Sequence, residues 1–280
     1  MEPTPKKLTI DRGQMDESIL HYYDEFDESA RLQGDSIERL RTQEIITRDM
    51  SDSPQMILDV GGAAGVYSFW LSKLGHYVHL LDASKKHIEM AKEESRRSTH
   101  PLASIAIGDG RDLPYEDESF DMVLVFGPLY HLTEREERVR ALSEAKRVMK
   151  PGALVYTAAI SRYASMIDGF LYDFVKDPAF VSIMMQDLEN GQHRNIGDSK
   201  YFTTAYFHLP DELEQEMVDA GFHEVDVYSV EGVSEILPDL AERMKDPRFR
   251  ETLFDVLRAT EKDSAFMGMS AHLLGKARKP

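Results

Sequence analysis

Hydrophobic residues between positions 55 and 160 gather in short runs, separated by segments with helical spacing. Each run has the length and the branched or aromatic composition of a buried strand. The five runs cover residues 56–60, 77–81, 103–107, 121–126 and 153–160. Strands that alternate with helices usually pair in parallel through crossover connections. The pattern therefore predicts an α/β fold with a doubly wound, mostly parallel sheet.

The segments between these runs predict helices with readable ends. One helix follows a cluster of glycines and ends at Gly75, because glycine easily adopts the left-handed conformation that closes a helix. A second helix follows residues 82–84. A third is predicted to begin at Thr133, because Glu136 three residues later would complete a capping box, and to end before Lys150.

The alternation stops after residue 160 and resumes near residue 209. Residues 161–208 hold many aromatic residues and methionines but no strand-like run. Beyond them we predict a helix over 209–222, a strand over 223–230, an acidic helical segment over 232–268 and a last strand within 269–279. This gives seven strands in total.

The first 50 residues also have a helical pattern, so the chain divides into four segments. They are residues 1–52, 53–160, 161–208 and 209–280. The second holds most of the sheet, the last completes it around an inserted helical segment, and the other two are helical. A turn is expected within the inserted segment at residues 246–249.

Composition narrows the classes of partner. The chain has 33 Lys and Arg against 50 Asp and Glu, a formal charge of −17, which repels the phosphate backbone of nucleic acids. Cysteine is absent, which excludes disulfides and thiolate chemistry. No apolar stretch approaches the ~20 residues that a membrane helix needs, and the N-terminus lacks the apolar core of a signal peptide. We expect a cytoplasmic protein without nucleic-acid or membrane partners.

The glycine cluster after the first strand reads D-V-G-G-A-A-G over residues 59–65. It does not fit the dinucleotide fingerprint G-x-G-x-x-G, because Ala63 and Val66 occupy the third and sixth places. The spacing resembles the E/D-x-G-x-G-x-G turn of class I S-adenosylmethionine-dependent methyltransferases, with Gly61 and Gly65 matching and Ala63 in place of the middle glycine. The alternative is a plain strand-to-helix turn that needs glycine for its backbone conformation.

Three further segments support the resemblance, which covers roughly residues 53–160. Asp82 ends the second strand, where a carboxylate can accept hydrogen bonds from both ribose hydroxyls. In the resembled family an acidic turn, here 108–114, holds the adenine, and residues 119–132 and 147–160 look like the fourth-strand and fifth-strand segments. The resemblance implies S-adenosylmethionine as the cofactor. The residues expected to bind it are Tyr22, Tyr23, Asp59, Gly61, Gly62, Ala63, Gly65, Asp82, Ala83, Asp109, Gly110, Arg111 and Phe126.

The segment F-G-P-L-Y-H-L, residues 126–132, bears on the substrate. Methyltransferases that act on exocyclic amines of bases or on glutamine carry a D/N-P-P-Y-like motif here, and Gly127 and Leu129 depart from it. Together with the acidic charge, this favours a small-molecule substrate over a nucleic acid. The Asp and Asp-Asn pattern of magnesium-dependent relatives is missing, and His76 and His79 should point to opposite faces of a strand, so we expect no catalytic metal.

Methyl transfer from a sulfonium is an in-line displacement that depends on holding the acceptor close and aligned. His131 is the leading candidate for a general base and Tyr130 its alternative, since both follow the fourth strand at the ligand-binding edge. A histidine that only caps a turn or orients Tyr130 is the competing interpretation. Arg41 is expected to pair on the surface with Glu44, with the cofactor carboxylate as its alternative partner.

The two flanking segments are expected to close over the site. Tyr22 and Tyr23 in 1–52 would form a lid, as an N-terminal helix does in similar enzymes, or would simply pack on the sheet. Residues 161–208 would form the substrate cover, and its expected substrate-binding residues are Arg162, Tyr163, His193 and Tyr201. The predicted function is methyl transfer to an N, O or S atom of a small metabolite. The rival functions are an RNA or protein methyltransferase, a non-catalytic S-adenosylmethionine-binding module and a nicotinamide dehydrogenase.

Overall fold

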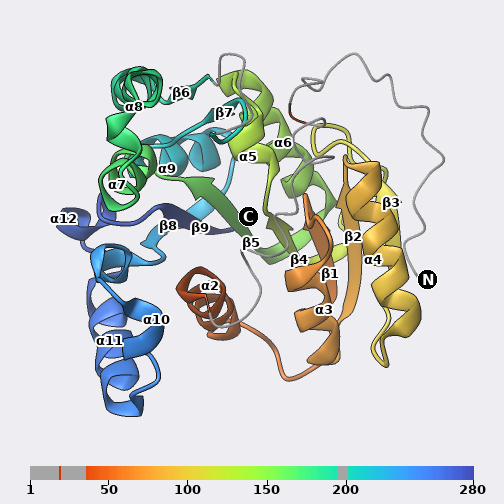
Figure 1. The fold of residues 1–280 in the computed structure, drawn as a ribbon. Helices are drawn as coiled ribbons and strands as arrows, with labels where there is room; N and C mark the ends of the chain where they lie inside the picture. The colour runs from red at the N-terminus through yellow and green to blue at the C-terminus, as the bar shows by residue number, and fades with distance from the viewer. Residues whose placement is uncertain (1–18, 20–35, 195–200) are drawn as a thin grey trace.

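The computed structural model describes Ile19, residues 36–194 and residues 201–280. Its centre is a seven-stranded sheet with the strand order β3-β2-β1-β4-β5-β9-β8 (Figure 1). The strands are β1 (Met56–Val60), β2 (Tyr77–Asp82), β3 (Ser104–Ile107), β4 (Phe120–Val125), β5 (Met149–Ile160), β8 (His223–Ser229) and β9 (His272–Arg278). All seven predicted strands are present, and β5 begins at Met149 instead of residue 153.

Strand direction decides which residues meet at the functional edge of the sheet. The strands β1 to β5 all pair in parallel, whereas β9 runs antiparallel to both β5 and β8. The predicted doubly wound, mostly parallel sheet is therefore confirmed. Because β9 is reversed, its first residue, His272, pairs with Ile160 at the end of β5.

Helices cover both faces of the sheet and bury an apolar core on each. On one face lie α2 (Ile37–Thr47), α3 (Val66–Lys73) and α4 (Lys85–Arg97), which pack against strand residues such as Ile57 and Leu80. On the other face lie α6 (Arg135–Val148) and α9 (Pro210–Asp219), which pack against Leu58 and Val123. Ile57 and Leu58 are neighbours on one strand and point to opposite faces, as the two-residue period of a strand requires.

The helix α2 is tied to the C-terminal part of the chain by a buried ion pair. Arg41 is fully buried and donates to Glu44 at 2.5 Å and to Glu261, while Arg48 also donates to Glu261. The predicted pairing with Glu44 is therefore present, but its predicted surface position is wrong. Glu261 follows the helix α11 (Pro247–Thr260), so this ion pair joins two segments that are far apart in the sequence.

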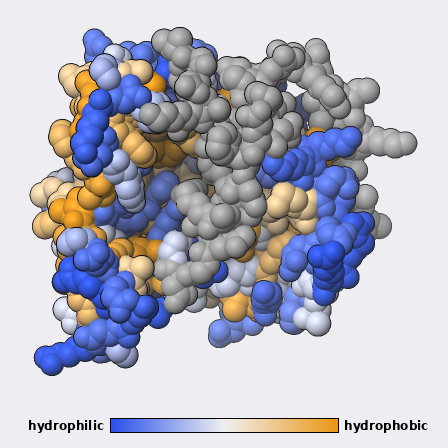
Figure 2. All heavy atoms as spheres, viewed as in Figure 1, coloured by the Kyte–Doolittle hydropathy of each residue, from blue (hydrophilic) through white to orange (hydrophobic). Residues whose placement is uncertain are grey.

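The segment after β5 forms a small helical layer above the edge of the sheet. It contains α7 (Ala164–Leu171), the 3₁₀ helix η3 (Phe174–Lys176) and α8 (Pro178–Asn190). The strands β6 (Gln192–His193) and β7 (Ala205–Tyr206) then pair antiparallel, so the prediction of no strand over residues 161–208 is wrong. Figure 2 shows hydrophobic residues gathered over α7 and α8, where Phe170 and Met185 are exposed.

Short helices fill the segment between β8 and β9. They are η4 (Gly232–Ile236), α10 (Leu240–Arg243), α11 (Pro247–Thr260) and α12 (Ser264–Met267). The expected turn at residues 246–249 is instead a helix start, because the Asp246 side chain accepts a hydrogen bond from the Arg248 backbone N–H and caps α11. No helix among the described residues has the length and apolar character to cross a membrane.

The connection after β4 also differs from the prediction. Gly127 turns the chain into a single helical turn, α5 (Pro128–His131), and α6 begins at Arg135 rather than at Thr133. The predicted capping box is absent, because the residue before α6 is Glu134. The carbonyl of Thr133 instead accepts hydrogen bonds from Arg138 Nη1 and Gln192 Nε2. Those two bonds hold the chain in a turn between α5 and α6.

Candidate active site

A cavity of about 440 Å³ lies at the edge where the parallel strands end. That is the edge at which open α/β sheets bind ligands. The predicted site residues on its wall are Gly61, Gly62, Ala63, Asp82, Ala83, Asp109, Gly110, Phe126, Tyr130, His131, His193 and Tyr201. Tyr22 and Tyr23 lie outside the described residues, although Ile19 and Thr42 from the N-terminal segment do line the cavity.

The glycine turn after β1 is shaped by its backbone. Gly61 and Gly65 have φ values of +78° and +93°, and Ala63 shares this left-handed region at +48°. A Cβ on Gly61 would lie 2.6 Å from Pro128 Cδ and 2.7 Å from the Phe126 carbonyl oxygen. Glycine there lets the turn pack against the connection after β4, so the plain-turn interpretation accounts for Gly61 on its own.

Asp82 joins this turn to the cavity. Its Oδ2 accepts a hydrogen bond from the Ala63 N–H at 2.9 Å, and its Oδ1 accepts one from the Ser84 N–H at 2.7 Å. Each carboxylate oxygen can accept more than one hydrogen bond, and Asp82 lines the cavity. A carboxylate at this place therefore fits the paired hydroxyls of a ribose.

Five of the predicted site residues do not line the cavity: Asp59, Gly65, Arg111, Arg162 and Tyr163. Arg111 folds back onto Asp109 and donates to Glu137 at 2.6 Å. Arg162 donates to Glu212 at 2.7 Å and to the Phe207 carbonyl oxygen at 2.8 Å. Both guanidinium groups thus hold parts of the fold together behind the cavity wall.

Asp59 lies behind the glycine turn, fully buried, with Oδ2 accepting a hydrogen bond from Ser68 Oγ at 2.6 Å. A Cβ on Gly62 would come within 2.6 Å of the same oxygen, so Asp59 supports the turn from beneath. Burial raises the pKa of Asp59 to about 7, and the charge of Asp82 adds to the effect. An acid whose pKa is raised by folding stabilises the fold only while it is protonated.

The titration of Asp59 predicts a pH dependence of stability. The stabilising contribution is complete below pH 4 and is lost as the pH rises through about 7, which amounts to about 4 kcal/mol. Asp59→Asn removes the titrating group, so the free energy of unfolding should decline less between pH 5 and pH 8 in this variant than in the wild type. Urea unfolding at both pH values measures the difference, and equal declines in the two proteins would contradict this role.

Comparison with known proteins agrees with this geometry. Residues 58–157 match the methyltransferase domain family. This segment contains the glycine turn, Asp82 and the whole connection through α5. The chain is a class I S-adenosylmethionine-dependent methyltransferase.

Its relatives include methyltransferases named for quinone biosynthesis and for a benzoquinol. The ubiquinone/menaquinone biosynthesis C-methyltransferase UbiE of Neisseria meningitidis is 27% identical over 181 residues, 62% of this chain and 69% of the relative. The mitochondrial 2-methoxy-6-polyprenyl-1,4-benzoquinol methylase of Danio rerio is 28% identical over 58% of this chain, and the match spans about half, 52%, of that protein.

Solved structures share the fold. A SAM-dependent methyltransferase from Methanosarcina mazei has a TM-score of 0.56 at 20% identity, covering 84% of this chain and 96% of that one. Phosphoethanolamine N-methyltransferase 2 of Haemonchus contortus, in complex with S-adenosyl-L-methionine, has a TM-score of 0.56 at 17% identity, covering 96% of this chain and 59% of that one. S-adenosylmethionine is the cofactor of this methyltransferase, and the Asp82 carboxylate beside the glycine turn offers hydrogen-bond acceptors that fit its ribose hydroxyls.

Tyr130 and His131 of the methyltransferase lie on α5 at the cavity wall. The two rings are 4.6 Å apart between centroids, and the His131 ring stacks at 6.1 Å on Phe202 from the substrate cover. Burial lowers the pKa of His131 to about 4. His131 is therefore a neutral imidazole at pH 7 and a weak proton acceptor, unlike the histidine with a pKa near ~6.5 expected from residue type alone.

His193 and Tyr201 bring the substrate cover to the cavity. His193 Nδ1 lies 2.8 Å from Oδ2 of the fully buried Asp187, and the Tyr201 hydroxyl donates to Asp177 at 2.7 Å. Both polar groups therefore already have partners within the cover. The predicted substrate-binding role of these two residues stays a prediction.

The structure adds a group that the sequence did not point to. Glu38, Glu231 and His272 place possible ligand atoms within 4.8 Å of one another, and Glu38 and His272 line the cavity. The carboxylate oxygens of Glu231 already accept hydrogen bonds from His272 Nδ1 and Ser270 Oγ, each at 2.6 Å. Metal independence stays a prediction. The sequence predicts a last strand that contains His272, and this is its one signal for the group. The antiparallel direction of that strand, which the structure shows, brings His272 to the site.

Proposed function

We propose that the methyltransferase transfers a methyl group to a small, largely apolar molecule held between α5 and the substrate cover. The observation that carries this proposal is the continuity of the cavity from Asp82 to a wall of aromatic rings. Phe174, Phe180 and Phe207 line that end of the same cavity. Ligand sites of small molecules are typically apolar with a few placed polar groups.

The residues around the glycine turn would hold the cofactor. Asp82 would accept hydrogen bonds from the ribose hydroxyls, and the backbone of Asp109 and Gly110 would lie beside the adenine. The start of α3 would favour the negative carboxylate of the methionine part. S-adenosylmethionine supplies an electrophilic methyl group on a positively charged sulfur.

The acceptor atom is proposed to be N, O or S, as the sequence suggests. The names of the quinone-pathway relatives favour carbon as a second candidate. In each case the protein's main contribution is to keep the acceptor about 3–3.5 Å from the methyl group and in line with the bond that breaks.

A labelling experiment tests the function. The protein is incubated with methyl-labelled S-adenosylmethionine and cell extract, with and without a metal chelator. Label should enter low-molecular-weight products, release S-adenosylhomocysteine and persist with chelator. Label in RNA or protein would favour the macromolecular rival, and cofactor binding without any transfer would favour the binding module.

Replacing His131 with alanine tests the role proposed for α5. We propose that the neutral His131 ring and Tyr130 contact the acceptor and orient it. Since misplacing an acceptor by about 1 Å can cost 10²-fold in rate, His131→Ala should lower turnover by about 10²-fold. Cofactor affinity, measured by calorimetry, should stay within threefold. The reverse result, full turnover at saturating cofactor with weakened cofactor binding, would place His131 against the cofactor instead.

A further inference from the structure

His272 lines the cavity, although the sequence analysis did not select it as a site residue. It is the first residue of β9, and it pairs with Ile160 because β9 is antiparallel to β5. Its neighbours Ala271 and Leu273 also line the cavity, as does Ile160. His272 therefore lies at the acceptor end of the cavity, on the opposite side of β4 from the turn that holds Asp82.

A buried carboxylate fixes the orientation of this imidazole. Glu231 is 5% exposed, and its Oε1 lies 2.6 Å from His272 Nδ1. Its Oε2 accepts hydrogen bonds from Ser270 Oγ at 2.6 Å and from the His272 N–H at 3.0 Å. Burial acts to raise the pKa of Glu231, but the positive charge of His272 when its ring is protonated, together with hydrogen bonds from His272 and Ser270, holds that pKa below its ordinary value. Glu231 is therefore ionised, and Nδ1 must donate to it.

The other ring nitrogen, Nε2, lies toward Glu38, a residue of the cavity wall. Since an ionised carboxylate can only accept, Nδ1 carries the proton of the neutral ring and Nε2 carries the lone pair. Nε2 lies 3.9 Å from Glu38 Oε1, and Glu38 lines the same cavity. This places the basic nitrogen of His272 on the side where an acceptor would bind.

Further carboxyl groups among the described residues lie near the pair of Glu231 and His272. Glu38 comes from α2, Asp168 from α7, and Glu231 and Glu235 from η4 and its first turn. Burial and the charge of Glu231 raise the pKa of Glu235 to about 8. Glu235 is therefore largely protonated at pH 7, and the negative charge of Glu231 is what stabilises a positive imidazolium once it forms.

We propose that His272 accepts the proton of a hydroxyl-bearing acceptor during methyl transfer, with Glu231 as its positioning residue. This rests on the proposed function. The acceptor oxygen forms its bond to the methyl carbon, the bond from that carbon to sulfur breaks with its electron pair left on sulfur, and the hydroxyl proton moves to His272 Nε2. The negative charge of Glu231 then balances the imidazolium, as the carboxylate does in other carboxylate–histidine pairs.

The ring tautomer can be measured without any substrate. In protein labelled with ¹⁵N-histidine, the His272 signals are assigned by their loss in His272→Gln. At a pH where the ring is neutral, the wild type should carry the proton on Nδ1. A proton on Nε2 would overturn the proposal, because that nitrogen could then not accept one.

A phenol that changes colour on ionisation tests the proton transfer itself. 4-Nitrophenol is added at pH 6 with S-adenosylhomocysteine present, and the phenolate absorbance is recorded. We expect added phenolate absorbance with the wild type, its loss in His272→Gln and a partial loss in Glu231→Gln. The matched control is His223→Gln, an exposed histidine at the other end of the neighbouring strand β8, which should behave as the wild type does.

Two outcomes would overturn the proposal. One is equal ionisation in the wild type and His272→Gln, and the other is no ionisation or no binding of the phenol by the wild type. Neither result depends on turnover. A failure to find any methylated metabolite would count against the proposed function and would leave this measurement unaffected.

Discussion

Replacing Arg138 with methionine should lower the free energy of unfolding by about 3–5 kcal/mol. Arg138 and Glu216 are each 2% exposed, and the guanidinium donates to Glu216 Oε1 at 2.7 Å. Its Nη1 also donates to the carbonyl oxygens of Leu132 and Thr133, both at 2.9 Å. Removing the arginine would take the ion-pair partner from a buried carboxylate and one hydrogen bond from each of the two carbonyl groups.

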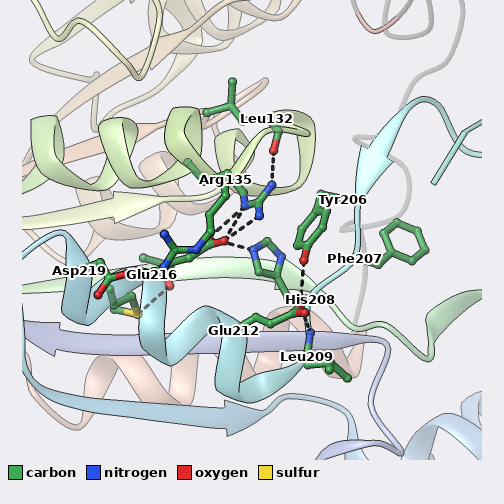
Figure 3. Close-up of polar contacts among 12 residues, drawn as sticks. Leu132, Arg135, Tyr206, Phe207, His208, Leu209, Glu212, Glu216 and Asp219 are labelled. Carbon is green, nitrogen blue, oxygen red and sulfur yellow. Dashed lines mark hydrogen bonds and ion pairs between the residues drawn. The ribbon is translucent and has the colours of Figure 1, made fainter. Parts of the chain in front are cut away.

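The surrounding contacts show why the effect should be large. Figure 3 shows Glu216 and His208 side by side, with Tyr206 and Glu212 close to them. His208 Nε2 lies 3.3 Å from Glu216 Oε2, and the Arg138 guanidinium lies 3.6 Å above the Tyr206 ring. The network joins α6 and α9 to the substrate cover, so it also supports the turn that follows His131.

A neighbouring ion pair provides the control. Arg135 is on the same helix and pairs with Asp219 on α9 (Figure 3), but both side chains are exposed, at 47% and 38%. Exposed pairs contribute about 0–1 kcal/mol. Arg135→Met should therefore change the free energy of unfolding by less than about 1 kcal/mol. Urea unfolding followed by circular dichroism measures both variants, and equal losses would contradict the assignment of Arg138 as the buried centre of this network.

Replacing Asp82 with alanine should weaken the binding of S-adenosylhomocysteine by about 100-fold or more. Two hydrogen bonds from ribose hydroxyls to a charged carboxylate are worth about 3 kcal/mol together at the lower end of their range. The same substitution removes the acceptor for the Ala63 N–H, which loosens the glycine turn. Isothermal titration calorimetry gives the two dissociation constants.

Two controls accompany the Asp82 measurement. Asp117→Asn changes an exposed carboxylate that pairs with Arg147 and does not line the cavity, so this variant should bind as the wild type does. NAD should not raise the melting temperature of the wild type, because the glycine spacing differs from the dinucleotide fingerprint. Unchanged affinity in Asp82→Ala would remove Asp82 from the cofactor site.

The strands of this fold could be predicted because each is a run of apolar residues bounded by polar residues or glycine. The strands β6 and β7 could not, since two residues each show no periodicity. The start of α6 was misplaced because Thr133 uses its carbonyl to accept from Arg138 rather than its hydroxyl to cap a helix. The local pattern of apolar and polar residues predicts most strands and helices, but tertiary contacts decide at which residue each of them begins.

The cofactor half of the site was more predictable than the acceptor half. Asp82 and the glycine turn lie in one contiguous segment, and the spacing of their residues along the sequence predicts the cofactor site. His272 and Glu231 are 41 positions apart, and only the reversed direction of β9 brings His272 to the ligand-binding edge. Arg162 is predicted to bind the substrate as a polar residue of 161–208; its guanidinium pairs with the half-buried Glu212 and does not line the cavity, and its substrate-binding role stays a prediction.

A crystal structure of the full chain with S-adenosylhomocysteine would test the central claim most directly, that one cavity at the strand ends holds both the cofactor and the acceptor. The account predicts ribose hydroxyls on Asp82, adenine beside Asp109 and Gly110, and the sulfur directed toward the space between Tyr130, His131 and His272. A nucleoside bound away from Asp82, or a sulfur directed away from the acceptor end of the cavity, would contradict it.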